Sequence, residues 1–172
     1  MTESTESSTS VVLDTIAKLG LTYEVIQIDP ALADTALFSK NYNFPMENSG
    51  NTIIVSSKKE PKLFVACVVL ATTRLDVNKR VRKLMGVSKA SFASEEEMKV
   101  LTGMEVGGVT PFSLPKEMKL YVDSSIMRLN WVILGGGGRD KKIKISPEVF
   151  KELGAEIIEN LAIPSNYSFN HK

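Results

Sequence analysis

The spacing of apolar residues in the first third of the chain predicts a helix, a strand and a second helix. Apolar side chains recur at helical spacing between Ser10, which can cap the start of a helix, and Gly20, which can end one. Residues 23–28 then alternate apolar and polar positions as a half-buried strand does, and residues 34–42 return to helical spacing. Proline, glycine and polar residues across 45–50 end this pattern.

The middle of the chain predicts a β-hairpin followed by a helix. Two runs rich in β-branched residues, 52–56 and 63–70, are joined by a short polar segment that suits a turn. We expect them to be the central strands of a sheet. Residues 76–84 then have helical spacing, and Gly86 is placed to end that helix.

The second half mixes short elements without a regular order. Ser94 and Glu97 form a capping box that starts a helix, and residues 90–93 before it suit a short edge strand. Further expected elements are a glycine- and proline-rich loop at 104–115, strands at 120–123, 131–134 and around 143–145, and a helix from 146 to 154. This irregular mixture favours an α+β fold over a repeating βαβ pattern.

The length and charge of the chain limit its organisation and its partners. A chain of 172 residues fits one domain, expected over 10–163, between a flexible leader at 1–9 and a tail at 164–172. The net charge of +1 argues against binding to DNA or RNA through bulk positive charge, so an RNA contact would need a local patch.

Neither a membrane segment nor a secretory signal is expected. No apolar stretch approaches the length of a bilayer span, and the polar N-terminus lacks the basic start and apolar centre of a signal peptide. We therefore expect a cytoplasmic protein. The single cysteine, Cys67, lies in an apolar run and is expected to be a buried apolar side chain.

Two glycine-containing segments and one basic segment could carry chemistry. The amides of residues 107–112 could polarise an ester carbonyl, although an ordinary tight turn explains the same residues. Glycines 135–138 and the cations that follow could cradle a phosphate, but they match neither a Walker loop nor a dinucleotide fingerprint and also suit a flexible turn. Residues 74–89 hold six basic side chains against one acidic one, which could meet RNA phosphates or be a solvated helix face.

The chain is poor in the side chains that most hydrolases use. The only histidine is His171, near the C-terminus, which argues against a histidine-assisted serine or cysteine nucleophile. A transition-metal site lacks ligands for the same reason, and we expect neither a metal nor another cofactor. Hydrolysis would have to rely on positioning, backbone donors and groups of the substrate itself.

Taken in order, four segments resemble the YbaK-like family of editing domains associated with prolyl-tRNA synthetase, free-standing or inserted in the synthetase. They are 51–55, 63–69, 101–111 and 135–139, and the likeness covers roughly residues 10–163. Its most specific part is the pattern L-T-G-x-x-x-G-G-[IV]-[ST]-P at 101–111, followed at a suitable distance by the second glycine loop.

The resemblance implies a mixed, mostly antiparallel, barrel-like sheet with surrounding helices. It also implies hydrolysis of the ester of a mischarged tRNA, such as Ala- or Cys-tRNA(Pro), by water and without an obligatory protein base. A tRNA acceptor end and an aminoacyl-tRNA synthetase are the implied partners. Carried over by position, the loop that acts on the ester consists of Gly107, Gly108, Val109 and Thr110, and the substrate-binding groups include Pro111, Gly135 and Gly136.

Two positions depart from the family pattern. Many members have a lysine where this chain has Asn51, and an acidic residue at about the position of Lys142. If the two strands face one another, Lys142 could replace the missing cation, while Asn51 and Thr52 orient the substrate. Arg74 is a second candidate for a phosphate contact.

Three functions are consistent with these residues. The first is an aminoacyl-tRNA deacylase that acts in trans. The second is a non-catalytic module that binds tRNA or a synthetase and retains the pocket. The third is a hydrolase of another small ester that uses the same loop.

Overall fold

The computed structural model describes the backbone of residues 2–165 and the side chains of residues 10–165. His171 and most of the expected C-terminal tail lie outside this range. The helices are α1 (Thr2–Lys18), α2 (Thr35–Tyr42), α3 (Arg82–Met85), α4 (Glu95–Thr102) and α5 (Val149–Glu152). Short 3₁₀ turns occupy Pro30–Leu32, Met46–Asn48 and Ser124–Arg128.

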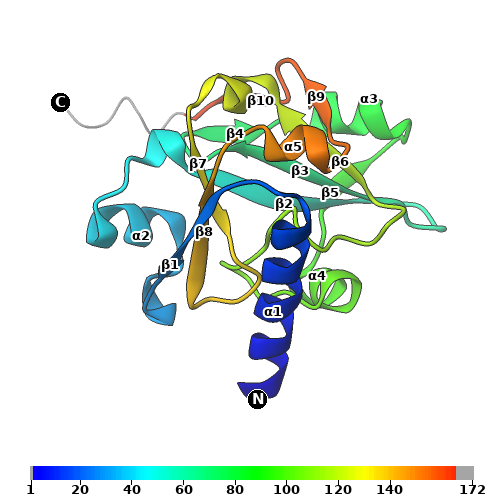
Figure 1. Ribbon diagram of the computed structural model, residues 1–172. Coiled ribbons are helices and arrows are strands. Elements are labelled where there is room, and N and C mark those ends of the chain that lie inside the picture. The colour runs from blue at the N-terminus through cyan, green and yellow to red at the C-terminus, as the bar shows by residue number, and fades with distance from the viewer. Residues whose placement is uncertain (1, 166–172) are drawn as a thin grey trace.

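The strands of the described chain form three sheets (Figure 1). A three-stranded antiparallel sheet has the order β1 (Tyr23–Gln27), β8 (Lys141–Ile145), β7 (Val132–Gly135). A five-stranded sheet has the order β5 (Ala90–Phe92), β2 (Gly50–Ser57), β3 (Phe64–Leu70), β6 (Lys119–Asp123), β9 (Glu156–Ile158). Strands β4 (Thr73–Leu75) and β10 (Ala162–Pro164) pair with each other.

The expected α+β fold with a mixed, mostly antiparallel sheet is confirmed. Strands β2 and β3 form the predicted hairpin, and β5 lies at a sheet edge as expected. Strand β6 runs parallel to both β3 and β9. A bridge between Ser49 and Ile133 connects the two larger sheets, which gives a barrel-like arrangement that does not close.

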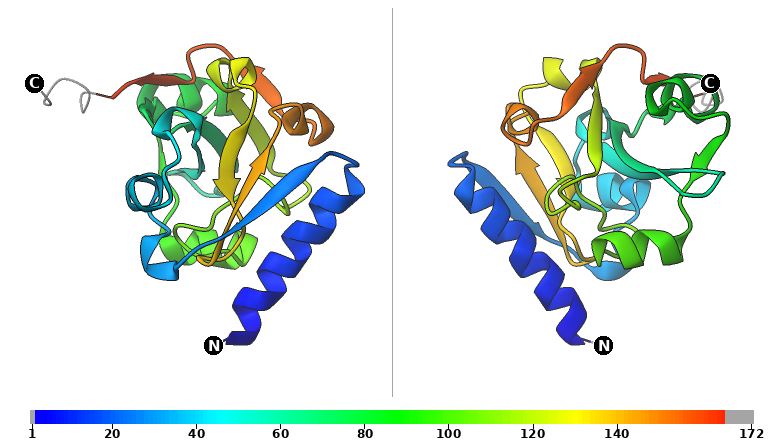
Figure 2. Two further views of the ribbon diagram at one scale, coloured as in Figure 1. Left: turned by 60° about the vertical axis from the view of Figure 1, so that its left-hand side comes forward. Right: turned by 90° about the vertical axis from the view of Figure 1, so that its right-hand side faces the viewer.

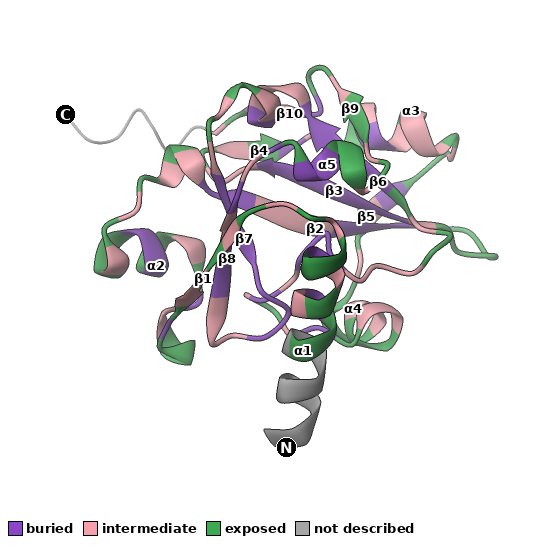
Figure 3. Ribbon diagram, viewed as in Figure 1, coloured by how far each residue is buried: buried purple, intermediate pink, exposed green. Residues whose placement is uncertain are grey.

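Apolar side chains fill both faces of the five-stranded sheet. Ile54, Val68 and Val122 point into the main core, which the three-stranded sheet and α1 cover through residues such as Ile143 and Ile16. The other face packs against β4, β10 and the segment after β4. Strands β3 and β7 are accordingly almost wholly buried (Figure 3).

The three-stranded sheet separates α1 from α2, which lie on opposite sides of it (Figure 2). Side chains along β8 point alternately to the two faces of the sheet, which explains this arrangement. Ile143 and Ile145 face the main core with α1. Lys142 and Lys144 face the other way, over the rings of Phe38 and Trp131. The side of the sheet that α2 covers therefore carries two cations.

Several boundaries differ from those that the sequence predicted. The first helix begins at Thr2 rather than at Ser10, so residues 2–9 of the expected leader have helical backbone. Apolar periodicity could not indicate this start, because residues 2–9 contain no apolar residue. Strands β4, β9 and β10 were not predicted, because no alternating pattern marks these short segments.

The helix predicted at 76–84 exists, but its first turn is a π-helix over Val77–Val81 that continues into α3. The Val81 amide donates to the Asp76 carbonyl at 3.0 Å, five residues back, and the Asp76 side chain accepts from the Lys79 amide at 3.2 Å. Gly86, with φ of 69°, ends α3 as expected.

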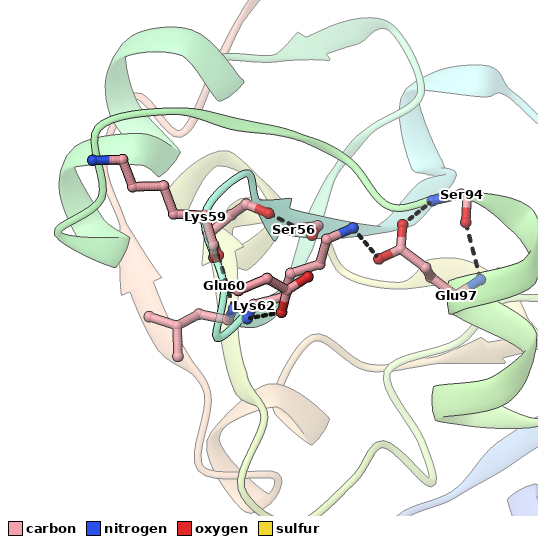
Figure 4. A network of polar contacts seen from close by, with 8 residues as sticks. Ser56, Lys59, Glu60, Lys62, Ser94 and Glu97 are labelled. Atoms are coloured by element: carbon pink, nitrogen blue, oxygen red, sulfur yellow. Dashed lines mark hydrogen bonds and ion pairs between the residues drawn. The ribbon is translucent and has the colours of Figure 1, made fainter.

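A small polar network connects the β2–β3 hairpin to α4 (Figure 4). Ser94 Oγ accepts from the Glu97 amide at 3.0 Å and Glu97 Oε1 accepts from the Ser94 amide at 3.1 Å, which confirms the predicted capping box. Glu97 also pairs with Lys62 of the hairpin, Nζ to Oε2 at 3.0 Å. These hydrogen bonds and this ion pair lower the pKa of Glu97, with the Ser94 amide contributing most.

We predict that Ser94→Ala lowers the free energy of unfolding by about 1 kcal/mol, because the substitution leaves the Glu97 amide without its cap. Urea denaturation followed by circular dichroism measures this change. The matched control is Ser88→Ala, an exposed serine whose hydroxyl makes no hydrogen bond in the described structure. Equal stability of the two variants would contradict the assigned role of the cap.

Candidate functional site

A cavity of about 350 Å³ lies where α2, β2, β7 and the loop before residue 110 meet. Helix α2 supplies Thr35 and Phe38, and the start of β2 supplies Asn51 and Thr52. Helix α4 contributes Met98 to the opposite wall. The remaining wall consists of Val106, Gly107, Val109, Gly135, Arg139 and Lys142 among others, so segments distant in sequence converge here.

The two glycine segments pack against each other. The Gly137 amide donates to the Gly108 carbonyl at 2.7 Å. A Cβ on Gly108 would overlap the backbone of Gly138, and one on Gly135 would overlap the carbonyl of Val109. Glycine at these positions thus permits two backbones to approach closely. Close packing alone explains why positions 108 and 135 are glycine, and no ligand is needed to account for them.

Only two amides of the 107–110 segment are available to a ligand. The Gly108 amide donates to the Glu105 carbonyl at 2.9 Å, and the Thr110 amide donates to the Met104 sulfur at 3.4 Å. The amides of Gly107 and Val109 make no hydrogen bond within the described part of the chain, and both residues line the cavity. Unpaired amides at a cavity wall are the kind of donors that an oxyanion site requires.

Four of the predicted site residues lie behind this wall rather than in it. Thr110 and Pro111 are buried, and Thr110 Oγ1 accepts from the Phe112 amide at 3.4 Å. Neither of them lines the cavity, and neither do Gly108 and Gly136. These residues therefore shape the loops that present Gly107, Val109 and Gly135.

Lys142 is a buried cation at the cavity wall, with only 6% of its surface exposed. Its Nζ donates to the carbonyl of Ala33 at 2.8 Å and to that of Gly107 at 3.1 Å. An ammonium group has three N–H donors, so one remains for a ligand. Burial, aided by the charge of Arg139 and opposed by that of Asp34, lowers the pKa of Lys142 to about 8.

Asn51 and Thr52 line the same cavity as Lys142. Thr35 Oγ1 donates to Asn51 Oδ1 at 2.9 Å, which orients the amide and leaves its Nδ2 without a partner in the described structure. Thr52 Oγ1 is buried and also has no hydrogen-bond partner there. A buried polar atom without a partner is costly, so a bound polar group would stabilise this wall.

Arg74 does not join this cavity. It lies on β4 and lines a second cavity of about 330 Å³. Of the three residues proposed to anchor a substrate, the structure thus brings Asn51 and Lys142 to one cavity and places Arg74 in another.

The cavity residues outside the predicted site include Thr35, Phe38 and Arg139. Arg139 donates to the Val106 carbonyl at 2.6 Å and to the Pro30 carbonyl at 3.2 Å (Nε) and 3.0 Å (Nη2), which holds the loop against the turn before α2. Periodicity predicts α2 but cannot show that its Thr35 faces Asn51.

The described residues offer little support for a metal site, a reactive cysteine or a membrane span. Among them no cluster of three or more His, Cys, Asp or Glu side chains could hold a metal ion. Cys67 is fully buried as expected, and burial raises the pKa of its thiol to about 12. Within the described chain, no helix has both the length and the apolar character needed to cross a membrane.

Comparison with known proteins identifies the family of the chain. The aminoacyl-tRNA editing domain family matches residues 29–153, which include every segment that forms the cavity. The chain therefore belongs to this family, as its motifs had indicated.

Curated relatives match about three fifths of the chain. The uncharacterized Bacillus subtilis protein YwhH is 32% identical over 98 residues, which are 57% of this chain and 61% of that protein. A proline–tRNA ligase of Brachyspira hyodysenteriae is 28% identical over 61% of this chain and 18% of the ligase. EbsC of Enterococcus faecalis, described as a candidate Cys-tRNA(Pro)/Cys-tRNA(Cys) deacylase, is 25% identical over 59% of each chain. The chain thus spans less than two thirds of each relative.

Solved structures share the whole fold. A candidate trans-editing enzyme for prolyl-tRNA synthetase superimposes with a TM-score of 0.76 at 19% identity, covering 88% of this chain and 95% of that one. A hypothetical protein gives a TM-score of 0.77 at 27% identity, covering 86% and 97%. These superpositions extend the fold match beyond residues 29–153.

We predict that Lys142 titrates near pH 8, below the ordinary lysine pKa of 10.5, because its ammonium is buried. NMR of lysine labelled with ¹³C at Cε measures this, and Lys142→Met assigns the signal by removing it. Because the unfolded chain keeps this proton up to about pH 10.5, the unfolding free energy of the wild type should rise relative to Lys142→Met between pH 8 and 10.5. A Lys142 signal that titrates with the exposed lysines would contradict the assigned burial.

Proposed function

We propose that the protein is an aminoacyl-tRNA deacylase that acts in trans on the ester of a mischarged tRNA. The observation that carries this proposal is the convergence in one cavity of donors that have no partner among the described residues: the amides of Gly107 and Val109, the Asn51 amide and the third N–H of Lys142. Membership of the editing-domain family and the likeness to EbsC support the same substrate class. Ala- or Cys-tRNA(Pro) are the first substrates to test.

Each donor has a role that suits its position. The Val109 and Gly107 amides hold the ester carbonyl oxygen and stabilise the negative charge that develops there. Lys142 and Asn51 anchor the terminal ribose or phosphate, with Lys142 supplying the charge that Asn51 cannot. Thr52 offers its unpaired hydroxyl to the aminoacyl group or to the attacking water.

The reaction needs no nucleophilic side chain. Water adds to the ester carbonyl carbon, the bond from that carbon to the ribose oxygen breaks, and a proton from the water ends on the released ribose hydroxyl. The two products are a free amino acid and the intact tRNA that bears this hydroxyl. Positioning and backbone donors lower the barrier, which suits a cavity whose described lining contains no histidine or cysteine.

A non-catalytic tRNA-binding or synthetase-partner module is the alternative, since Asn51 stands where many family members have lysine. A panel of mischarged tRNAs separates the two functions. Release of the amino acid from at least one of them supports the deacylase, whereas binding of all of them without release supports the module. Turnover of small esters without turnover of charged tRNA would point instead to a general esterase.

We predict that Lys142→Met lowers kcat/KM for the best mischarged tRNA by about 10- to 150-fold, because a hydrogen bond from a charged donor contributes about 1.5–3 kcal/mol. Single-turnover and steady-state deacylation rates measure this loss. The matched control is Lys144→Met, which changes the next lysine on the same face of β8, outside the cavity. Wild-type deacylation by Lys142→Met would remove Lys142 from the proposed site.

A further inference from the structure

A second cavity of about 330 Å³ adjoins the proposed active site and plays no part in the mechanism above. Strands β4 and β5, the start of the π-helix and Ile163 of β10 form its walls. Phe92, at the end of edge strand β5, lines both this cavity and the first one. The two cavities therefore meet at a single aromatic side chain.

Phe92 is unusually exposed for a phenylalanine, with 59% of its surface accessible. Its neighbours in the sheet do not cover it, because β5 is an edge strand and pairs only with β2 among the described strands. Its position beside both cavities leaves an apolar ring accessible to a ligand that extends from one cavity to the other. An aromatic ring in such a place can stack against a nucleobase.

The second cavity also carries positive charge. The guanidinium of Arg74 lines it and forms no hydrogen bond or ion pair with another described residue. Exposed Lys79 and Lys89 flank the lining residues in sequence. The acidic group of the cavity, Asp76, already accepts the amide of Lys79. Arg74 is thus free to meet an anion such as a phosphate.

We propose that this second cavity binds the unpaired nucleotides that precede the aminoacylated one at the 3′ end of tRNA. The base next to the terminal nucleotide stacks on Phe92, and a phosphate of the same strand contacts Arg74. This inference rests on the proposed function, since the ester must lie in the first cavity. It adds a binding subsite for the single-stranded 3′ end of the tRNA. It also assigns a function to Arg74, which is remote from the ester.

The arrangement of the two cavities suits the binding of single-stranded RNA. Successive nucleotides present a flat base and a phosphate in turn, and the two cavities present an aromatic ring and then a guanidinium. Stacking tolerates any base, so this subsite would add affinity for a 3′ end without selecting a particular amino acid. A protein partner would instead need a broader apolar surface than one ring beside an arginine.

Binding of an uncharged RNA oligonucleotide that ends in the CCA sequence of tRNAs tests the subsite without requiring catalysis. Fluorescence anisotropy should show that Phe92→Ala weakens binding about 5- to 150-fold, the range expected from loss of one stacked base. Arg74→Gln should weaken binding at low salt and reduce the slope of log K against log salt by about 0.7. The matched controls are Val100→Ala and Arg128→Gln, which change an exposed apolar residue and a cation that line neither cavity.

Two results would overturn the proposal. One is wild-type affinity of Phe92→Ala, with thermal unfolding showing that the variant is folded. The other is wild-type affinity for an oligonucleotide whose penultimate base is removed, because stacking would then contribute nothing.

Kinetics separate this inference from the proposed function. Arg74→Gln should raise KM for mischarged tRNA, leave kcat unchanged and leave hydrolysis of an aminoacylated adenosine unchanged, because that substrate lacks the preceding phosphates. If the wild type releases no amino acid from any tRNA, the proposed deacylase fails while the binding assay still tests the subsite. If the wild type is active and Arg74→Gln has an unchanged KM, the subsite fails alone.

Discussion

The close approach of two glycine segments determines the shape of the whole site. The backbone around Gly108 packs directly on that of residues 137 and 138, and Gly135 packs on Val109. This contact fixes the loop that presents the Val109 amide to the cavity. It also places the carbonyl of Gly107 where Lys142 can donate to it. Residues with side chains could not allow such a close approach, because a Cβ at Gly108 or Gly135 would separate the two backbones.

The second constraint is electrostatic. Lys142 is buried beside carbonyl oxygens, and it forms no ion pair with a carboxylate of the described residues, although Asp34 lies near enough to oppose the fall in its pKa. A buried cation costs solvation free energy, and the two hydrogen bonds that it donates to carbonyl groups only partly compensate for it. An anionic or strongly polar ligand would complete the compensation. Asn51 and Thr52 extend the same wall with unpaired polar atoms, so this whole side of the cavity favours a polar ligand over an apolar one.

Much of this arrangement could be predicted from local patterns, and the remainder depends on contacts between distant segments. The hairpin of β2 and β3, the capping box at Ser94 and the glycine loops have local signatures, and the sequence indicated each of them. The π-helical turn and strands β4, β9 and β10 have none. The hydrogen bond from Thr35 to Asn51 arises only on folding, and so do those from Arg139 to Pro30, which lies 109 residues away in sequence. For the same reason the sequence could not show that Arg74 belongs to a different cavity from Lys142.

We place the aminoacyl ester in the cavity beside Val109. The decisive test is a structure of the protein with a non-hydrolysable adenosine that carries an aminoacyl group through an amide at its 3′ position. We expect the carbonyl oxygen of the analogue to lie within hydrogen-bonding distance, about 2.7–3.1 Å, of the Val109 or Gly107 amide. We also expect Lys142 Nζ to contact the ribose of the analogue. An analogue bound elsewhere on the protein, making no hydrogen bond with the Gly107 or Val109 amide, would contradict this placement of the ester.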